Sequence, residues 1–316
     1  MSDAPVLRVR DLHKTFHIGF FRKKVEAVRG IGFEVERGEI FGLLGPNGAG
    51  KTTTIKMILR LIFPMKGRIE LFGEESPGPA AMARLGYLPE NPYIYQYLRP
   101  LEFLDLCGRL TGMPREAREK RARELIERVG LGHAVDRPIG KFSKGMMQRI
   151  GLAQALLHDP ELLILDEPMS GLDPIGRKEV RDLIVEQHRA GKTILFTSHI
   201  LSDVELLCDR VGILRRGRMS HYGRLDELLR AQKRRVEVEL EEVSGELREK
   251  LGAFATELVE VEGRTQVVLT GEEGAQPALS LALSHGARVV AVTPGRETLE
   301  DLFVRDALRE EESVAR

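Results

Sequence analysis

The glycine-rich stretch GPNGAGKT, residues 45–52, has the spacing G-x-x-x-x-G-K-[ST] and lies between an apolar run and a helix-like segment. Glycines let the backbone curl so that successive N–H groups point at one anion, and the dipole of the following helix adds to the attraction. Lys51 would hold the β- and γ-phosphates of a nucleotide, and Thr52 would offer its hydroxyl to Mg²⁺. An accidental Lys-Thr pair after a glycine-rich turn is the alternative, and the strand-to-helix context disfavours it.

Two carboxylates follow the apolar run LLIL, residues 162–165. Asp166 would end a buried strand where it reaches the Mg²⁺ shell, and Glu167 could orient and deprotonate a water molecule. Taken alone, such a pair would more often cap the next helix, but the phosphate loop reverses that preference. His199 ends a second apolar run, TILFTSH, at the edge where ligands gather in open parallel sheets. We expect its imidazole to hydrogen-bond a γ-phosphate, although a lone histidine there is more often structural.

The stretch KFSKGMMQR, residues 141–149, looks like the start of a second anion-binding helix. Ser143 is a candidate N-cap, and Gly145 lies in the first turn, where free N–H groups and the helix dipole attract anions. One chain therefore carries two elements suited to phosphate, far apart in sequence.

The segments around these residues predict an α/β domain. Strand-like alternation covers residues 6–16 and 25–35, and EIFGLL, residues 39–44, reads as a buried strand entering the glycine-rich turn. Helical spacing runs through about residues 97–157, which we interpret as a helical insertion. The runs LLIL and TILFT, with a helix-like segment between them, indicate a parallel sheet. We place this domain at residues 1–228.

Residues 229–316 show a different order of elements. Strand-like and helix-like segments alternate as βαββαβ, the order of a ferredoxin-like module, and a further helix is expected at about residues 297–308. The basic step QKRR, residues 232–235, is the expected link to this small α+β domain. Such a domain could bind a small ligand as a regulator or simply support a dimer.

The composition narrows the classes of partner. Lys and Arg number 48, as do Asp and Glu, so no bulk basicity draws the protein to nucleic acid or to an anionic membrane. Cys107 and Cys208 lie in helical-looking apolar patterns, which favours buried thiols in a reducing cytoplasm over a disulfide or a metal site. No run approaches about 18 apolar residues, and the signal-peptide pattern is absent, so we do not expect the chain itself to cross a membrane.

Together the motifs resemble those of the ATP-binding cassette (ABC) transporter ATPases. The phosphate loop, KFSKGMMQR, LLILDEP, SGLD (residues 170–173) and TSH occur in that order, within about residues 5–225. The resemblance implies a P-loop NTPase ABC cassette, with a mixed-sheet core, an N-terminal antiparallel β region and the helical insertion, that uses ATP and Mg²⁺. The ATP-binding residues it implies are Phe16, Gly45, Pro46, Asn47, Gly48, Ala49, Gly50, Lys51, Thr52 and Thr53. The implied catalytic residues are Lys51, Glu167 and His199, and the implied metal ligands are Thr52, Glu90 and Asp166.

In that family the Ser-containing signature sequence binds the γ-phosphate held by the phosphate loop of a second subunit, which implies a homodimer. The residues implied to bind ATP across the interface are Ser143, Lys144, Gly145, Met146 and Asp173. The signature departs from the usual L-S-G-G-Q, because Phe142 replaces Leu, Lys144 replaces the first Gly and Met146 replaces Gln. Lys144 could contact phosphate or be merely solvated, and Asp173 could equally be a helix N-cap.

Two further positions keep alternatives open. Phe16 would stack on adenine in the family's manner, which tolerates GTP because stacking does not read the base edge; the alternative is a core residue of the first strand. Glu90 stands where most of the family has a Gln that reaches Mg²⁺ and the lytic water, and the alternative is a polar loop residue.

The segments GYLPE and ETLEDLFV, with the Ser-Lys-Gly-Met signature, resemble the ATP-binding subunits of ABC-2 type exporters. This resemblance implies a separate polytopic membrane permease as partner, no nucleic acid, and a cytoplasmic position on the inner face of the cell membrane. One alternative is a soluble ABC ATPase acting on ribosomes or DNA; its types usually carry two cassettes or a long coiled coil, and neither occurs in this sequence. The other is a regulatory ABC protein, which the intact Lys51, Asp166, Glu167 and His199 disfavour.

Overall fold

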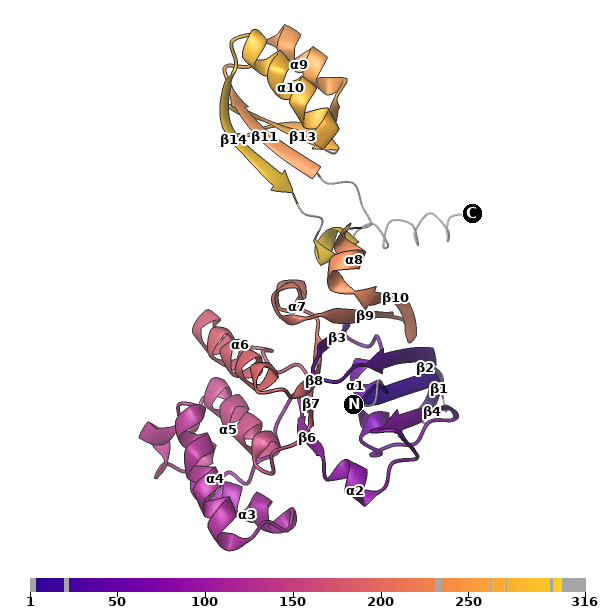
Figure 1. Cartoon of the computed structure of the whole chain (residues 1–316), viewed down its shortest axis with the longest axis vertical. Helices are drawn as coiled ribbons and strands as arrows, with labels where there is room; N and C mark the ends of the chain where they lie inside the picture. Colours follow the sequence, from indigo (N-terminus) through magenta and orange to yellow (C-terminus); the bar gives the residue numbers. More distant parts are fainter. Residues whose placement is uncertain are drawn as a thin grey trace. The chain divides into compact units, whose positions relative to one another are not determined.

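The computed structural model of the chain describes residues 4–19, 23–230, 235–261, 263–270, 272–295 and 298–302 (Figure 1). The chain divides into two compact units, Met1–Arg224 and Leu225–Arg316. The division falls at the start of helix α8, Leu225–Arg230, whereas the sequence placed it after residue 228, within that helix. Residues 232–234 of the expected link and most of the expected terminal helix lie outside the described residues, and Arg235 begins strand β11.

A six-stranded sheet with the order β10-β9-β3-β8-β7-β6 forms the centre of the first unit. Its strands are β3 (Ile40–Leu44), β6 (Leu85–Leu88), β7 (Leu162–Leu165), β8 (Thr193–Ser198), β9 (Arg210–Arg215) and β10 (Arg218–Arg224). Strands β9 to β6 are parallel, and β10 adds an antiparallel edge. Every residue of β3, β7 and β8 is buried, as expected for a parallel sheet covered on both faces.

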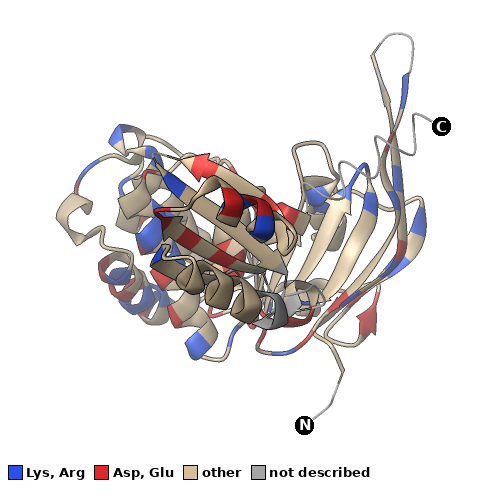
Figure 2. Ribbon diagram, turned by 90° about the horizontal axis from the view of Figure 1, so that it is seen from above, with Lys and Arg blue, Asp and Glu red and all other residues tan. Residues whose placement is uncertain are grey.

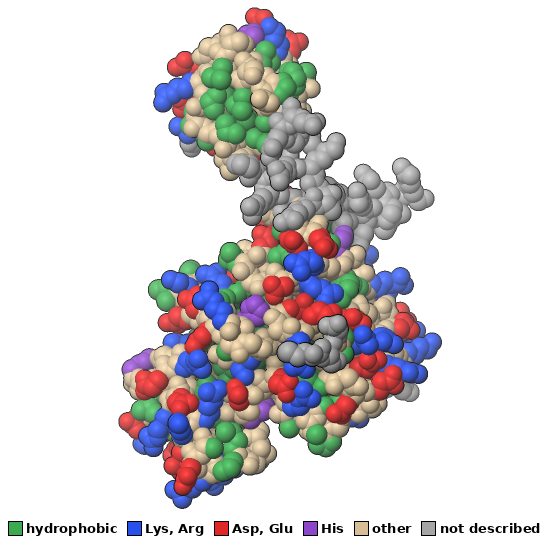
Figure 3. Space-filling view, viewed as in Figure 1, with side chains coloured by type: hydrophobic (Ala, Val, Ile, Leu, Met, Phe, Trp, Pro, Cys, Tyr) green, Lys and Arg blue, Asp and Glu red, His purple; other side chains and the backbone are tan. Residues whose placement is uncertain are grey.

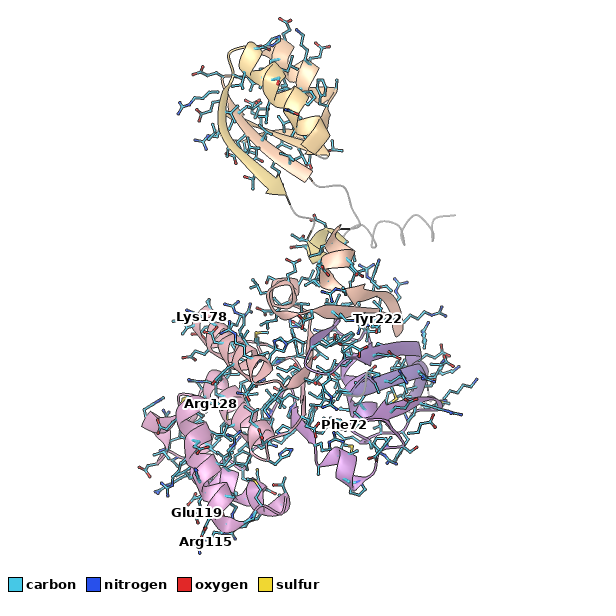
Figure 4. All side chains as sticks on the ribbon, viewed as in Figure 1. Phe72, Arg115, Glu119, Arg128, Lys178 and Tyr222 are labelled. Atoms are coloured by element: carbon cyan, nitrogen blue, oxygen red, sulfur yellow. The ribbon has the colours of Figure 1, made fainter. Side chains whose placement is uncertain are left out.

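A second, antiparallel sheet with the order β2-β1-β4-β5 lies on one side of the central sheet (Figure 1). Its strands are β1 (Leu7–Ile18), β2 (Lys23–Val35), β4 (Lys66–Leu71) and β5 (Glu74–Glu75). The Phe33 ring stacks on the Phe41 ring with centroids 5.2 Å apart, which joins β2 to β3. Tyr222 of β10, labelled in Figure 4, packs 6.1 Å from the same Phe41 ring. The mixed-sheet core and the N-terminal antiparallel region are therefore confirmed.

Helices cover the opposite side of the central sheet (Figure 1). They are α3 (Pro100–Leu110), α4 (Arg115–Arg128), α5 (Lys144–Leu156), α6 (Pro174–Arg189) and α7 (Leu201–Leu207), with two short 3₁₀ turns at Gly132–Ala134 and Ile139–Lys141. Helix α1 (Lys51–Ile58) follows β3, and α2 (Pro79–Met82) precedes β6. Arg128 of α4 pairs with Glu186 of α6 at 2.6 Å, which ties the helical insertion to the sheet-bearing part of the unit.

The second unit has the element order βαββαβ. Its elements are β11 (Arg235–Glu241), α9 (Gly245–Gly252), β12 (Ala255–Val261), β13 (Arg264–Thr270), α10 (Glu272–Ser284) and β14 (Arg288–Gly295). All strand pairs are antiparallel, in the order β12-β13-β11-β14, and alternate residues of β11 pack against Leu247 and Leu251 of α9. Both the element order and the strand order are those of a ferredoxin-like module.

Lys and Arg are as numerous as Asp and Glu, and on the face shown in Figure 3 charges of both signs are interspersed over each unit (Figures 2 and 3). Cys107 and Cys208 are free, half-buried thiols, and burial raises the pKa of Cys107 to about 11. Among the described residues, no helix combines the length and the apolar character needed to cross a bilayer.

Candidate active site

The glycine-rich loop between β3 and α1 has the conformation that the sequence requires. Gly45 has φ of 152° and Gly50 has φ of 108°, values that side chains with a Cβ rarely adopt. A Cβ added at Gly45 would lie 2.4 Å from the Leu214 carbonyl oxygen, and one added at Gly50 would lie 2.6 Å from that of Ala27. Both glycines are therefore needed for the loop's curl and for the close approach of neighbouring backbone.

The turn of the β9–β10 hairpin anchors this loop through backbone hydrogen bonds. The Gly217 N–H donates to the Ala49 carbonyl at 3.1 Å, and the Gly217 carbonyl accepts from the Arg29 N–H at 2.7 Å. Pro46, Asn47 and Gly48 at the tip of the loop are exposed, and Thr52 and Thr53 at the start of α1 are half-buried. The loop is thus fixed at its base and open to a ligand at its tip.

Lys51 lies inside the curl of the loop with 6% of its surface exposed. Its Nζ donates to the Gly45 carbonyl at 2.6 Å and, more weakly, to the Pro46 carbonyl at 3.5 Å. The same Nζ lies 3.1 Å from Glu167 Oε1, which comes from the end of β7. The structure therefore joins the predicted phosphate lysine and the predicted base, although they are far apart in sequence.

Asp166 is almost fully buried at the end of β7. Its Oδ1 accepts hydrogen bonds from Thr197 Oγ1 at 2.7 Å and from Thr52 Oγ1 at 3.4 Å. Burial raises the pKa of the Asp166 carboxyl, and the two hydroxyl hydrogen bonds oppose that shift. Carboxylate and hydroxyl oxygens are donors that Mg²⁺ prefers, so Thr52 and Asp166 fit the predicted metal site. The described residues contain no group of three or more His, Cys, Asp or Glu that could hold a metal ion.

Glu167 is held from three directions. Its Oε2 lies 2.7 Å from His199 Nδ1, its Oε1 lies 3.1 Å from Lys51 Nζ, and its backbone N–H donates to Thr197 Oγ1 at 2.9 Å. Oε1 is buried and accepts no well-aligned hydrogen bond from the described residues, so its contact with Lys51 is an ion pair by distance alone. Glu167 also has φ of 50°, a left-handed conformation that is uncommon for a residue with a Cβ.

The second predicted anion element begins α5. Ser143 Oγ accepts a hydrogen bond from the Met146 N–H at 3.3 Å, which makes Ser143 the predicted N-cap. A Cβ added at Gly145 would make only ordinary van der Waals contacts, the nearest with Leu172 Cδ2 at 3.8 Å, so this position is not crowded. The Met146 side chain is buried, which leaves only its backbone able to face a ligand. The exposed Lys144 extends over Gly171, where an added Cβ would lie 2.3 Å from its Nζ.

The remaining predicted residues make no hydrogen bond or ion pair with Lys51 or Glu167 in the described part of the chain. Asp173 is the N-cap of α6, and its Oδ1 accepts from the Gly176 N–H at 2.9 Å. Glu90 is exposed just after β6, and no hydrogen bond or ion pair of its side chain occurs within the described residues. Likewise, no hydrogen bond or ion pair in the described part of the chain joins residues 143–146 to residues 45–52. The two elements predicted to bind anions are therefore not bonded to each other within the described chain.

Phe16 lies one strand away from the phosphate loop. It pairs with Val25 across the β1–β2 ladder, and Ala27 of the same β2 strand packs against Gly50. The Phe16 ring is half-buried, and Lys14 Nζ stands 5.5 Å from its centroid. Part of the ring is therefore exposed, as a base-stacking residue requires.

Thr197 is the site residue that the sequence interpretation missed. Its hydroxyl connects Asp166 and Glu167, yet only His199 was singled out in TILFTSH. The available signal was a hydroxyl residue inside an otherwise apolar, fully buried strand, where a polar group needs hydrogen-bond partners.

Known proteins resemble this chain in sequence and in fold. A family model described as "ABC transporter" matches residues 28–170. The bacitracin transport ATP-binding protein BcrA of Bacillus licheniformis is 39% identical over 309 residues, which cover 96% of this chain and 97% of that protein. The Nod factor export ATP-binding protein I of Ralstonia nicotianae is 34% identical over 320 residues, covering 98% and 96%. A solved structure of an ATP-binding subunit of an ABC transporter, 35% identical, has a TM-score of 0.63 over 72% of this chain and 92% of that one.

Proposed function

The chain belongs to the ABC transporter ATP-binding proteins, and from that membership we propose that two copies close on two ATP·Mg²⁺ to drive export by a separate membrane-spanning subunit. The relatives confirm the family that the motifs predicted, and the solved structure confirms the cassette fold. The chain is an ATPase. The paired subunits, the export partner and the residue roles below are our proposal.

The observation that carries the proposal is the Glu167 carboxylate, which lies between Lys51 and His199 beside the phosphate loop. Lys51 and the N–H groups of residues 45–52 would bind the β- and γ-phosphates, and Phe16 would stack on the base. Thr52 and Asp166 would hold Mg²⁺, which when bound neutralises negative charge on the phosphate oxygens. Glu167 would take a proton from the attacking water, while His199 would hydrogen-bond the γ-phosphate.

Pairing of two subunits is supported by the lack of a hydrogen bond or ion pair between the two proposed anion-binding elements in the described part of the chain. Within one chain, Ser143 caps the start of α5, and no hydrogen bond among the described residues joins it to the phosphate loop. A second copy could place its Ser143 and Gly145 against the open side of the γ-phosphate, with Asp173 at the interface. Contact between Lys144 and the phosphate is not part of the proposal, because the Lys144 ammonium lies over Gly171 of its own chain.

The membrane partner is supported by the names of two relatives, one for bacitracin transport and one for Nod factor export. We propose that a polytopic permease binds the helical insertion and the loop after Glu90, which would hold the chain at the inner face of the cell membrane. The permease would carry the cargo contacts. Copurification of a tagged chain from its own membrane should yield a protein with several membrane spans, and recovery of ribosomes or DNA instead would contradict this partner.

Two substitutions test the proposed chemistry in the full chain. Glu167→Gln should slow hydrolysis by at least about 100-fold, because it removes the base, and should enrich an ATP-bound dimer on size exclusion. Lys51→Ala should abolish ATP binding. Glu161→Gln, which removes a carboxylate paired with Arg84 away from the loop, is the control and should leave hydrolysis unchanged. Wild-type hydrolysis by Glu167→Gln would show that the base is another residue.

A further inference from the structure

Thr197 connects the two acids of the site through a single hydroxyl. Thr197 Oγ1 donates to Asp166 Oδ1 at 2.7 Å and accepts from the Glu167 N–H at 2.9 Å. Building on the proposed function, we propose that Thr197 is the positioning residue of the acid pair: it fixes the Asp166 carboxylate and the backbone turn that aims Glu167 at the γ-phosphate. Its own hydroxyl is not proposed to touch ATP.

The strand register delivers Thr197 to this position. Leu165 of β7 pairs with Phe196 of β8, so the next residue on each strand, Asp166 and Thr197, meet just beyond the last registered pair. On the other side, the Asp166 N–H donates to the Leu88 carbonyl of β6 at 2.8 Å. Thr197 is fully buried, so no water can easily replace its hydroxyl. Hydrogen bonds to the two neighbouring strands, β6 and β8, therefore hold Asp166 and Glu167 in place.

The bond to the Glu167 N–H has a specific consequence for the base. Glu167 leaves β7 with φ of 50°, a conformation that L-residues avoid unless their surroundings hold it. This turn directs its carboxylate to Lys51 Nζ at 3.1 Å and to His199 Nδ1 at 2.7 Å. Without an acceptor at residue 197, the Glu167 N–H is buried and unpaired, and the turn loses the bond that holds it.

The test compares Thr197→Val, which keeps the volume and removes the hydroxyl, with Thr197→Ser, which keeps the hydroxyl and removes a methyl group. We expect Thr197→Val to lower kcat by about 100-fold, the loss typical of a reacting group displaced by about 1 Å. Its affinity for ADP in EDTA should stay within about twofold of wild type, because the phosphate loop is untouched. Thr197→Ser should recover kcat to within about threefold of wild type.

Hydrogen exchange supplies a readout that does not depend on activity. In nucleotide-free protein, the backbone N–H of Glu167 should exchange at least about tenfold faster in Thr197→Val than in Thr197→Ser, because only the valine removes its acceptor. Equal exchange in the two variants would overturn the proposed bond.

Thr193→Val is the matched control on the same strand. Thr193 is also buried, and its hydroxyl accepts one backbone hydrogen bond, from the Gly38 N–H at 2.9 Å, away from the acids. This variant should keep wild-type kcat per folded molecule. If Thr197→Val does not fold, Thr197→Cys, whose thiol is a weak hydrogen-bond partner, should still lose about tenfold in kcat. Wild-type kcat in Thr197→Val or Thr197→Cys, or an equal loss in Thr197→Ser, would overturn the positioning role.

Failure of this inference can be told from failure of the proposed function. If Glu167→Gln is inactive while Thr197→Val hydrolyses ATP normally, Glu167 stands as the base and only the positioning role is wrong. If Glu167→Gln hydrolyses ATP at the wild-type rate, the assignment of the base is wrong, whatever Thr197→Val does.

Discussion

Replacing Glu167 by Gln should tighten the binding of ADP to the nucleotide-free chain by about tenfold, which corresponds to about 1.4 kcal/mol. In the structure Lys51 Nζ lies 3.1 Å from Glu167 Oε1, and each side chain is less than one-tenth exposed. An incoming β-phosphate must therefore share or take a lysine whose charge is already paired with a carboxylate. Glutamine has the same shape but no charge, so Lys51 would be free to bind phosphate.

The size of the effect follows from the distance. Two unit charges 3.1 Å apart attract by about 5 kcal/mol at an effective dielectric constant of about 20. Most of this is recovered when phosphate replaces the carboxylate, because Lys51 exchanges one anion for another and keeps its bond to the Gly45 carbonyl at 2.6 Å. We take about a quarter of this attraction, or about 1.3 kcal/mol, as the free energy that ADP binding loses to the Lys51–Glu167 pair. Removing that loss corresponds to a change of about tenfold in Kd.

The assay is calorimetric titration of ADP into the full chain in EDTA, so that neither hydrolysis nor a metal ion enters the measurement. Asp166→Asn is the matched control, because it removes a neighbouring buried carboxylate that makes no ion pair with Lys51 in the described part of the chain. If the gain came only from weaker repulsion of phosphate, both variants would gain equally. An unchanged affinity in Glu167→Gln would refute the competition for Lys51.

Three other perturbations have defined outcomes. Arg84 bonds hold the pKa of Glu161 at about 2, below its usual 4.5, so this carboxylate stabilises the fold above about pH 4.5 and loses that contribution as the pH falls toward 2. The Arg84–Glu161 pair is partly exposed, so Glu161→Gln should lower the free energy of unfolding by only about 1 kcal/mol at pH 7. The difference between wild type and variant, measured by urea denaturation, should shrink below pH 4.5. A difference that stays constant with pH would contradict this linkage. Gly50→Ala should lower the free energy of unfolding by about 2 kcal/mol and the melting temperature by about 4–8 °C, because the new Cβ would meet the Ala27 carbonyl. Scanning calorimetry measures this shift, and an unchanged melting temperature would argue against a strained loop. Phe16→Leu should weaken ATP and GTP binding equally, by about fivefold in calorimetric titration, whereas a purely structural Phe16 would change the melting temperature alone.

Local patterns predicted much of the fold because they express local constraints. The phosphate loop needs glycines at Gly45 and Gly50 for backbone reasons that any strand-to-helix turn of this kind shares. The βαββαβ order of residues 229–316 followed from alternating periodicities, which are set by the geometry of one strand or one helix. Ser143 is the N-cap that the sequence predicted, and Asp173, for which an N-cap was the alternative, is one too, since a cap bonds within three residues of itself.

Local patterns could not predict contacts that depend on strand register or packing. The Met146 side chain packs inward because the buried face of α5 is set by the helices around it, so the expected ATP-binding role, which stays a prediction, could fall only to its backbone. The anchor of the phosphate loop comes from Gly217, far along the chain, and no spacing in the sequence reveals that contact.

The sequence by itself determined the chemistry of this protein: a phosphate loop, two acids, a histidine and a second anion-binding helix start, each recognisable because its function depends on residue type and short-range spacing. Only the tertiary structure decided how these groups act on one another. The parallel register of β7 and β8 places Thr197 between Asp166 and Glu167, and the order of the strands brings Glu167, the proposed base, to Lys51 and His199. Such contacts arise from the pairing of strands distant in sequence, which is fixed by the burial of the whole sheet.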